Sequence, residues 1–248
     1  MWRSMGSKIL FIAALHGDEG FGVDALKEIE KKLDKERYKY DWVIGNPKAY
    51  GQNTRYTETD LNRIAPGNSA SEIYEERRAA ELVALSKDFD YVIDIHGTTA
   101  KSGVFVLVTN PSTANLMLAA CMPLQNVVVW AADVSKKCGP VTQYAKCPAI
   151  EIECGPKDDK KIRNKISEVV ENIIKTKSRS VSELMKNIVN QKYFYVTGSI
   201  ENIDTTDMKE FEKTQVDGEE FYPLLINSYK IGSARKMKRI DFFGLLSY

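Results

Sequence analysis

The sequence predicts an α/β fold, built on a mixed, mostly parallel sheet with flanking helices. Two observations support this class: apolar runs of strand length alternate with segments of helical periodicity, and several of the runs end in polar clusters. Apolar residues make up 43% of the 248 residues, enough for a sizeable core. A largely disordered or low-complexity protein is therefore excluded.

The expected strands and helices alternate up to residue 175. A continuous apolar run predicts a first strand at 9–15, and apolar residues at helical spacing predict a helix at 23–33. The other expected strands lie at 40–45, 91–95, 103–108, 127–131 and 149–152, and the other helices at 71–86, 113–122 and 156–175. The last helix has one apolar face and closes the sheet.

The composition changes after residue 175. Segment 176–190 is polar and basic, with sparse apolar positions. From Tyr193 onward, aromatic and β-branched residues mix with Gly and Asp turns, which predicts a small β-rich C-terminal domain. We therefore expect two domains, an α/β domain at 1–178 and a β-rich domain at 190–248.

Charge and cysteine content limit the classes of partner. The formal net charge is +1 with no long single-sign block, so nucleic acid is not expected. No apolar run approaches the roughly 18–20 residues of a membrane span, so no membrane association is expected. The four cysteines lack CxxC spacing, which favours the reducing cytoplasm. A homo-oligomer is compatible with the sequence.

The only two histidines, His16 and His96, each stand at the end of an expected strand. Ligand sites in open parallel sheets lie beyond the carboxyl ends of strands, so the two should converge. Glu19 forms a His-x-x-Glu pair with His16, and together the three make the two-histidine, one-carboxylate set of catalytic zinc. Taken alone, His16 could instead be a loop histidine bonded to backbone, and the spacing does not identify the ion.

Carboxylates accompany these residues on two strands. Asp94 shares a strand face with His96 and is either a group that orients the imidazole or a buried cap on a neighbouring loop. Glu151 and Glu153 share a face near the end of the strand at 149–152. Glu153 is the better placed as a general base, and the alternative for both is a solvated strand face.

The loop at 53–63 is rich in Arg and Asn. Arg55, Asn62 and Arg63 would suit a substrate that bears a carboxylate, because a guanidinium pairs bidentately with carboxylate and can stabilise an oxyanion. The alternative is a solvated loop whose arginines pair with Glu58 and Asp60. On the loop alone, this alternative is favoured.

Five short motifs in this order resemble the succinylglutamate desuccinylase/aspartoacylase family, which is related to the zinc carboxypeptidases. They are His16-Gly17-Asp18-Glu19, Asn46-Pro47, Thr54-Arg55-Tyr56 with Asp60-Leu61-Asn62-Arg63, Asp94-Ile95-His96-Gly97-Thr98-Thr99, and Ile152-Glu153-Cys154-Gly155-Pro156. The resemblance spans roughly residues 8–175. It implies a zinc carboxypeptidase-like fold with a small C-terminal β-rich domain, and one zinc ion per chain on His16, Glu19 and His96.

The resemblance also implies an activity in amino acid metabolism. The chain would be a zinc-dependent amidohydrolase that cleaves the linear amide of small N-acyl amino acids, with Glu153 as general base towards a zinc-bound water. Arg55 would polarise the scissile carbonyl, and Asn62 and Arg63 would hold the substrate's carboxylate. A C-terminal tyrosine of the family also reaches the substrate, and Tyr229 is the counterpart here, although it falls two positions early.

Two other functions remain open. One is a zinc carboxypeptidase acting on short peptides. In the family the C-terminal domain narrows the entrance and excludes peptides, and this region is short here. The other is a catalytically inactive relative that binds a metal or an anion, although Asp18 and Glu19 would repel a phosphate at this loop. An acidic substrate side chain would need one more cation, for which Lys101 and Lys146 are candidates.

Overall fold

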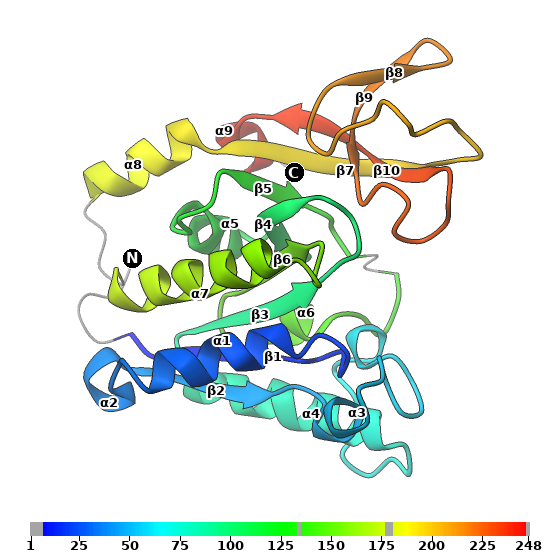
Figure 1. Ribbon diagram of the computed structural model, residues 1–248. Helices are drawn as coiled ribbons and strands as arrows, with labels where there is room; N and C mark the ends of the chain where they lie inside the picture. The colour runs from blue at the N-terminus through cyan, green and yellow to red at the C-terminus, as the bar shows by residue number, and fades with distance from the viewer. Residues whose placement is uncertain (1–6, 133–134, 177–180, 247–248) are drawn as a thin grey trace.

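A ten-stranded sheet forms the centre of the computed structural model, which describes residues 7–132, 135–176 and 181–246 (Figure 1). The strand order is β2-β1-β3-β6-β4-β5-β7-β10-β9-β8. The strands are β1 (Ile9–Ala13), β2 (Tyr40–Ile44), β3 (Tyr91–Gly97), β4 (Gly103–Val108), β5 (Asn126–Val129), β6 (Ala149–Gly155), β7 (Lys192–Glu201), β8 (Thr214–Val216), β9 (Glu219–Leu224) and β10 (Ser233–Ile240). Pairing is parallel from β2 to β6 and again from β4 to β7, which confirms the predicted mixed, mostly parallel class.

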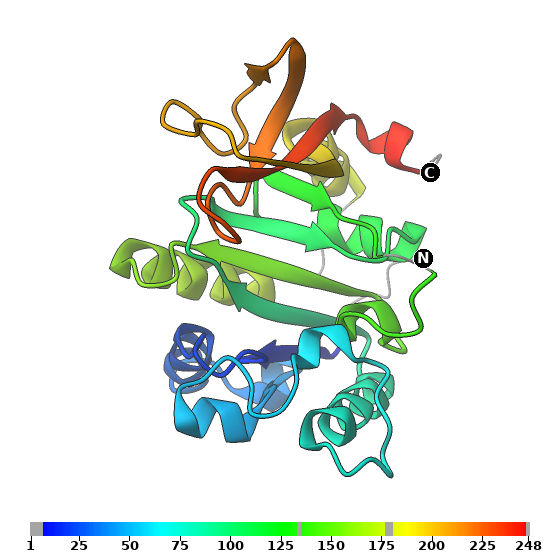
Figure 2. The same cartoon turned by 90° about the vertical axis from the view of Figure 1, so that its right-hand side faces the viewer.

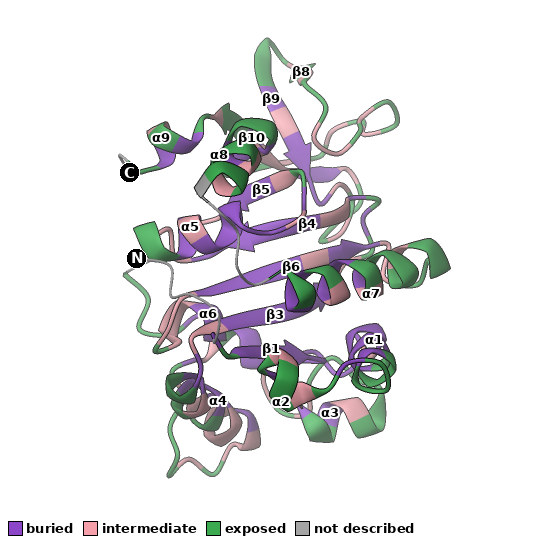
Figure 3. Cartoon of the chain, turned by 90° about the vertical axis from the view of Figure 1, so that its left-hand side faces the viewer, coloured by how far each residue is buried: buried purple, intermediate pink, exposed green. Residues whose placement is uncertain are grey.

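Helices cover both faces of the sheet, as the alternation of side chains along each strand requires. The helices are α1 (Phe21–Glu30), α2 (Lys35–Tyr38), α3 (Pro47–Gln52), α4 (Tyr74–Leu85), α5 (Thr113–Ala120), α6 (Val141–Tyr144), α7 (Lys160–Lys175), α8 (Val181–Asn190) and α9 (Phe242–Leu245). Phe11 and Ala13 of β1 pack in one core cluster with α1, α5 and α7, whereas Leu10 and Ile12 pack with α4 and α6. Figure 3 shows these central strands buried.

The C-terminal strands continue the central sheet. β7 pairs in parallel with β5, and β10 pairs antiparallel with β7 (Figure 2, yellow to red). A third core cluster joins Phe194, Leu224 and Met237 of these strands to Phe105 and Leu107 of β4. The C-terminal region is therefore β-rich as expected. Its division from the α/β part as a separate domain stays a prediction, and the expected boundary at 178 falls outside the described residues.

Most predicted elements match the observed ones within a few residues, and the differences have local causes. The strand expected at 9–15 ends at Ala13, because Ala14 adopts a left-handed φ of 52°. The helix expected at 156–175 begins at Lys160, where the Asp159 side chain caps it by accepting from the Lys161 N–H. α3 and α8 lie in segments for which no helix was predicted. Among the described residues, no helix is both long and apolar enough to span a membrane.

Candidate metal centre

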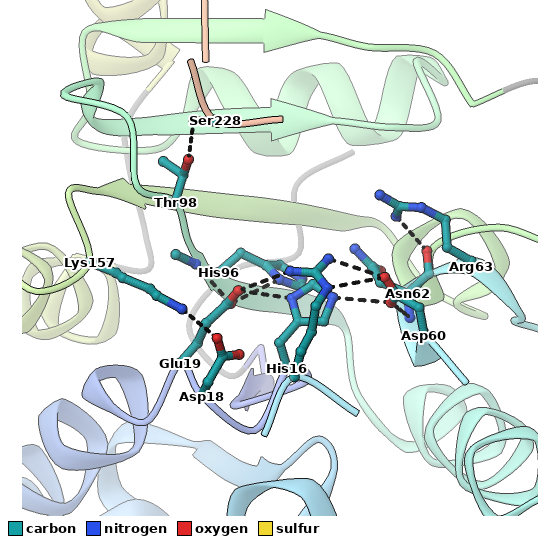
Figure 4. A network of polar contacts seen from close by, with 12 residues as sticks. His16, Asp18, Glu19, Asp60, Asn62, Arg63, His96, Thr98, Lys157 and Ser228 are labelled. Carbon is teal, nitrogen blue, oxygen red and sulfur yellow. Dashed lines mark hydrogen bonds and ion pairs between the residues drawn. The ribbon is translucent and has the colours of Figure 1, made fainter. Parts of the chain in front are cut away.

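Three buried side chains converge where β1 and β3 end. His16 and Glu19 lie in the turn between β1 and α1, and His96 lies near the end of β3, which pairs with β1 (Figure 4). One ligand atom from each lies within 4.8 Å of the others. Glu19 stands between the imidazoles, with its Oε1 at 2.9 Å from His16 Nδ1 and its Oε2 at 3.4 Å from His96 Nδ1. The sequence-predicted ligands are thus brought together.

The turn that carries His16 packs tightly against α3. A Cβ atom on Gly17 would lie 2.1 Å from the carbonyl carbon of Ala49, a distance that no side chain tolerates. The Gly17 N–H donates to the carbonyl oxygen of Arg55 at 3.2 Å, which connects this turn to the Arg- and Asn-rich loop. Glycine is therefore required at this position by close approach of backbone.

Each imidazole has a second carboxylate on its other nitrogen. His96 Nε2 lies 3.0 Å from Asp94 Oδ2, and His16 Nε2 lies 3.1 Å from Asp60 Oδ1. Such contacts orient a ligand imidazole and leave Nδ1 for an ion. Asp94 has the position that its predicted role requires, while Asp60 was quoted only as part of a motif. Its contact with His16 joins residues 44 positions apart, and spacing alone gave no signal for it.

The charges of the cluster suit a cation. Burial opposes ionisation of Glu19, yet hydrogen bonds from His16 and His96 hold its pKa well below the ordinary value. Burial also opposes protonation of His96, but Asp94 and Glu19 raise its pKa well above the ordinary value. An ion bound at these donors would replace the protons on the two Nδ1 atoms. Two imidazoles and one ionised carboxylate fit a single zinc ion.

Glu153 lies beside the cluster on β6. It pairs in register with His96 of β3, and its side chain is half-buried. Burial, together with the negative charges of Glu19 and Glu151, raises the pKa of Glu153 to about 7. Glu151 is buried and accepts from Thr142 Oγ1 at 2.7 Å, whereas Glu153 lines the hollow beside the cluster. A carboxyl group with a pKa near neutrality can both take up and release a proton.

The loop residues surround the same site. Arg55 pairs with Asp60 at 3.1 Å, as the solvated-loop alternative expected, yet it also lies 3.9 Å from Glu19 and lines the hollow over the cluster. Asn62 is buried, and its Oδ1 has no hydrogen-bond partner within the described ranges. Arg63 Nη1 donates to the backbone carbonyl oxygen of Asn62 at 2.9 Å, and both residues line the hollow over the three candidate ligands.

Tyr229 forms part of the opposite wall. It follows Ser228, whose Oγ lies 3.1 Å from Thr98 Oγ1 and so joins the β9–β10 connection to the end of β3 (Figure 4). Tyr229 is 57% exposed, and it lines the hollow over the three candidate ligands. The structure therefore brings this tyrosine to the rim of the site. Lys157, which pairs with Asp18 at 2.6 Å, lines the same hollow and was not predicted.

Two adjoining hollows meet at this site. The first, of about 370 Å³, lies over the three candidate ligands, and the second, of about 520 Å³, extends away from them. Five residues line both hollows: Asn62, Arg63, Glu153, Leu225 and Tyr229. A substrate held across this boundary would have one part over the cluster and the other in the larger hollow.

The fold and the cluster together define an α/β protein with a His-Glu-His site for a single metal ion. Residues 5–180 match the model of the succinylglutamate desuccinylase/aspartoacylase catalytic domain, and the chain belongs to that family. A probable aspartoacylase of Prochlorococcus marinus subsp. pastoris is 36% identical over 123 residues, which are 46% of this chain and 41% of the relative. One of Trichodesmium erythraeum is 28% identical over 125 residues, 46% of this chain and 43% of the relative. The matches thus span less than half the length of these curated relatives.

Solved structures share the fold over nearly the whole chain. Murine aminoacylase 3 matches with a TM-score of 0.71 at 20% identity, over 96% of this chain and 97% of that one. The succinylglutamate desuccinylase from Chromobacterium violaceum matches with a TM-score of 0.69 at 16% identity, over 96% of this chain and 86% of that one. At these identities the likeness shows the fold.

Proposed function

We propose that this protein is a zinc-dependent hydrolase that cleaves the amide bond of small N-acyl amino acids. The observation that carries this proposal is the buried Glu19 between two Nδ1 atoms, with Glu153 on the neighbouring strand. Membership of a deacylase family supports it, and the substrate is proposed only as a class. His16, Glu19 and His96 would hold one zinc ion per chain.

Zinc bound there supplies a Lewis acid and lowers the pKa of a water molecule towards about 7. The Glu153 carboxylate takes up a proton from the water that attacks the amide carbon. As the C–N bond breaks, Glu153 returns that proton to the nitrogen of the leaving amine. The pKa of Glu153, raised to about 7 by burial, suits both transfers. Asp60 and Asp94 keep the imidazoles oriented through their Nε2 atoms.

The remaining residues bind the substrate. Arg55, at the mouth of the hollow, stabilises the negative charge that develops on the scissile carbonyl oxygen. Asn62 and Arg63, at the boundary of the two hollows, hold the α-carboxylate, because the Nδ2–H groups of an asparagine and the guanidinium of an arginine both donate to oxygen. Tyr229 covers the bound substrate from the β9–β10 connection.

Elemental analysis of the purified chain, combined with a hydrolysis screen, tests this function. About one zinc per chain, with amine release from N-acetyl or N-succinyl amino acids, is expected. Glu153→Gln should retain the zinc and lose turnover by about 10²–10⁴-fold, because it removes only the proton acceptor. Absence of turnover after zinc is restored would contradict the proposal, and release of C-terminal residues from short peptides instead would favour the carboxypeptidase alternative.

A further inference from the structure

Glu75 is a buried carboxylate that the proposed chemistry does not use. It lies in the first turn of α4, is fully buried and lines neither hollow. We propose that Glu75 is a positioning residue, which holds the middle of the loop at 53–63 and thereby fixes Arg55 and Asp60 at the candidate metal centre. The inference rests on the proposed function only where it concerns turnover, since the contact of Asp60 with His16 requires no substrate.

The middle of the loop and the first turn of α4 bind each other from both sides. The Thr57 N–H donates to Glu75 Oε1 at 2.8 Å, and Thr57 Oγ1 donates to the same oxygen at 2.5 Å. The Glu58 N–H donates to Glu75 Oε2 at 3.3 Å. In return, Glu58 Oε1 accepts from the Tyr74 N–H at the start of α4, also at 3.3 Å.

Asn46 joins the same carboxylate to α3. Its Nδ2 donates to Glu75 Oε1 at 3.2 Å, while its Oδ1 accepts from the Ala49 N–H and caps the helix. Ala49 is also the residue against which Gly17, next to His16, packs by close approach of backbone. Glu75 is therefore connected to the turn of His16 through α3 as well as through the loop.

The negative charge of Glu75 is stabilised by neutral donors. Burial opposes its ionisation, yet the hydrogen bonds from Thr57, Asn46 and Glu58 hold the pKa of Glu75 below its ordinary value. No ion pair joins it to a cation within residues 7–132, 135–176 and 181–246. A buried charge that loses a donor is poorly solvated, so the loop cannot open here without a free-energy cost.

The contacts of Glu75 lie between two loop residues that reach the candidate metal centre. The Arg55 carbonyl oxygen accepts from the Gly17 N–H, and Asp60 Oδ1 lies 3.1 Å from His16 Nε2. The side chains of Arg55 and Asp60 also pair with each other at 3.1 Å. Because segment 57–58 connects the two residues, its displacement would move both side chains relative to the candidate ligands.

Glu75→Gln tests this role, since the side chain keeps its size but loses its charge and one acceptor. We expect kcat of the folded, zinc-loaded variant to fall about 100-fold, because Arg55 moves away from the oxyanion that it stabilises. KM should change far less, because the oxyanion forms only in the transition state. A variant that was only less stable would keep the wild-type kcat in its folded fraction, which circular dichroism and zinc analysis measure.

Glu76→Gln is the matched control. Glu76 is half-buried in the same turn of α4, and its side chain has no hydrogen bond or ion pair with any residue that the structure describes. This variant should have the wild-type kcat.

Thr57→Val and Thr57→Ser repeat the test from the side of the loop, and they decide it if Glu75→Gln does not fold. Valine removes the hydroxyl that donates to Glu75 and should lower kcat. Serine keeps a hydroxyl and should restore most of the wild-type rate. An equal kcat in these two variants would overturn the role of this contact.

Trypsin cleavage after Arg55 reports on the loop without any substrate. Cleavage requires local opening of the backbone, so Glu75→Gln and Thr57→Val should be cut faster than the wild type and Glu76→Gln at the same rate. Mass spectrometry identifies the fragment that begins at Tyr56. Chelator competition should also show weaker zinc binding in Glu75→Gln, because Asp60 no longer supports His16.

These measurements separate the positioning role from the proposed function. If folded, zinc-loaded Glu75→Gln keeps the wild-type kcat and the wild-type cleavage rate, the positioning role is overturned and the hydrolase function stands. A change in either quantity without the other would also overturn it. If even the wild type hydrolyses no N-acyl amino acid, faster cleavage and weaker zinc binding in Glu75→Gln would support the positioning role and contradict the hydrolase function.

Discussion

At the scale of single residues, the candidate centre is a chain of carboxylates and imidazoles rather than three isolated ligands. Asp60, His16, Glu19, His96 and Asp94 follow one another through contacts of 2.9–3.4 Å. The outer carboxylates hold the Nε2 atoms, so both Nδ1 atoms face Glu19. Burial opposes ionisation of Asp60, but the hydrogen bond from His16 holds its pKa well below the ordinary value. Asp60 is therefore an anion that supports His16.

Asp60→Asn tests this support. The amide keeps the shape of the side chain and an acceptor for His16 Nε2, but it removes the charge that favours donation from Nδ1 to an ion. We expect the zinc dissociation constant to rise by about 10–100-fold. Competition with a chromogenic chelator measures this change. Glu58→Gln, in the same loop but without contact to His16, should bind zinc as the wild type does, and equal affinity in both variants would contradict the role of Asp60.

The convergence of His16, Glu19 and His96 could be predicted from sequence because histidine is scarce in this chain and both copies end apolar strands. Asp60 and Arg235 could not be predicted as contacts, since each depends on how a distant segment packs. Asp60 meets His16 through the fold of the loop at 53–63 against β1, and Arg235 meets Trp130 through the pairing of β10 with β7 and of β7 with β5. Periodicity and spacing carry no information on such contacts.

At the scale of elements, strong periodicity gave correct strands, and short or polar helices were missed. α3 lies in a segment that resembles a polar loop, although Asn46 accepts from the Ala49 N–H and Pro47 occupies the first turn, which are the signals of a helix start. α8 lies in a segment that is polar and basic overall, although its apolar residues, at positions 181, 184, 185, 188 and 189, have the spacing of one helix face. Both helices therefore carry local signals, which the polar composition of the surrounding segments obscured.

The packing of α3 against the His16 turn gives a prediction at this scale. Gly17→Ala would place a methyl group against the Ala49 backbone, so the turn or α3 must shift. We expect a loss of about 1–3 kcal/mol in the free energy of unfolding, together with weaker zinc binding. Urea unfolding and chelator competition measure the two effects. Gly51→Ala in α3 is the control, because a Cβ there meets nothing within 4 Å and should be neutral or stabilising.

Glu210 gives the connection between β9 and β10 a pH-dependent stability. Its Oε2 accepts from the Leu225 N–H at 2.9 Å, its Oε1 accepts from the Ile226 N–H at 2.8 Å, and burial raises its pKa from 4.5 to about 7. Between these values the unfolded chain has released the proton that the folded chain retains. Stability contributed by this group therefore falls as pH rises from 4.5 to about 7.

Glu210→Gln should remove this dependence. The variant loses one acceptor at every pH, which lowers its melting temperature by a constant amount. Because only the wild type loses stability as pH rises, the melting temperature of the variant relative to the wild type should increase between pH 5 and pH 8. Scanning calorimetry across this range measures the difference. Glu212→Gln, an exposed neighbour, should show no such trend. If the difference in melting temperature between Glu210→Gln and the wild type is the same at every pH, the Glu210 carboxyl has the same pKa in the folded and the unfolded chain.

At the scale of the whole molecule, both ends of one sheet contribute residues to the two adjoining hollows. The strands at the N-terminal side position the candidate ligands His16, Glu19 and His96, and the family match at residues 5–180 covers this part. The C-terminal region supplies Tyr229 on the β9–β10 connection and Arg235 on β10, both outside that match. The larger hollow is lined by residues of both parts, so its shape depends on the continuity of the sheet.

This continuity bears on whether 190–248 is an independent domain. A chain that ends at residue 190 would expose the edge of β5 and remove the partners of Phe105 and Leu107 in the third core cluster. We expect it to lose cooperative thermal unfolding by circular dichroism, because an open edge and an uncovered apolar face both favour aggregation. Met237→Ala in the full chain should lower the free energy of unfolding by about 2–5 kcal/mol, and the chain should still unfold in a single transition. Two separate transitions, or a cooperative truncated chain, would instead support the division into two domains.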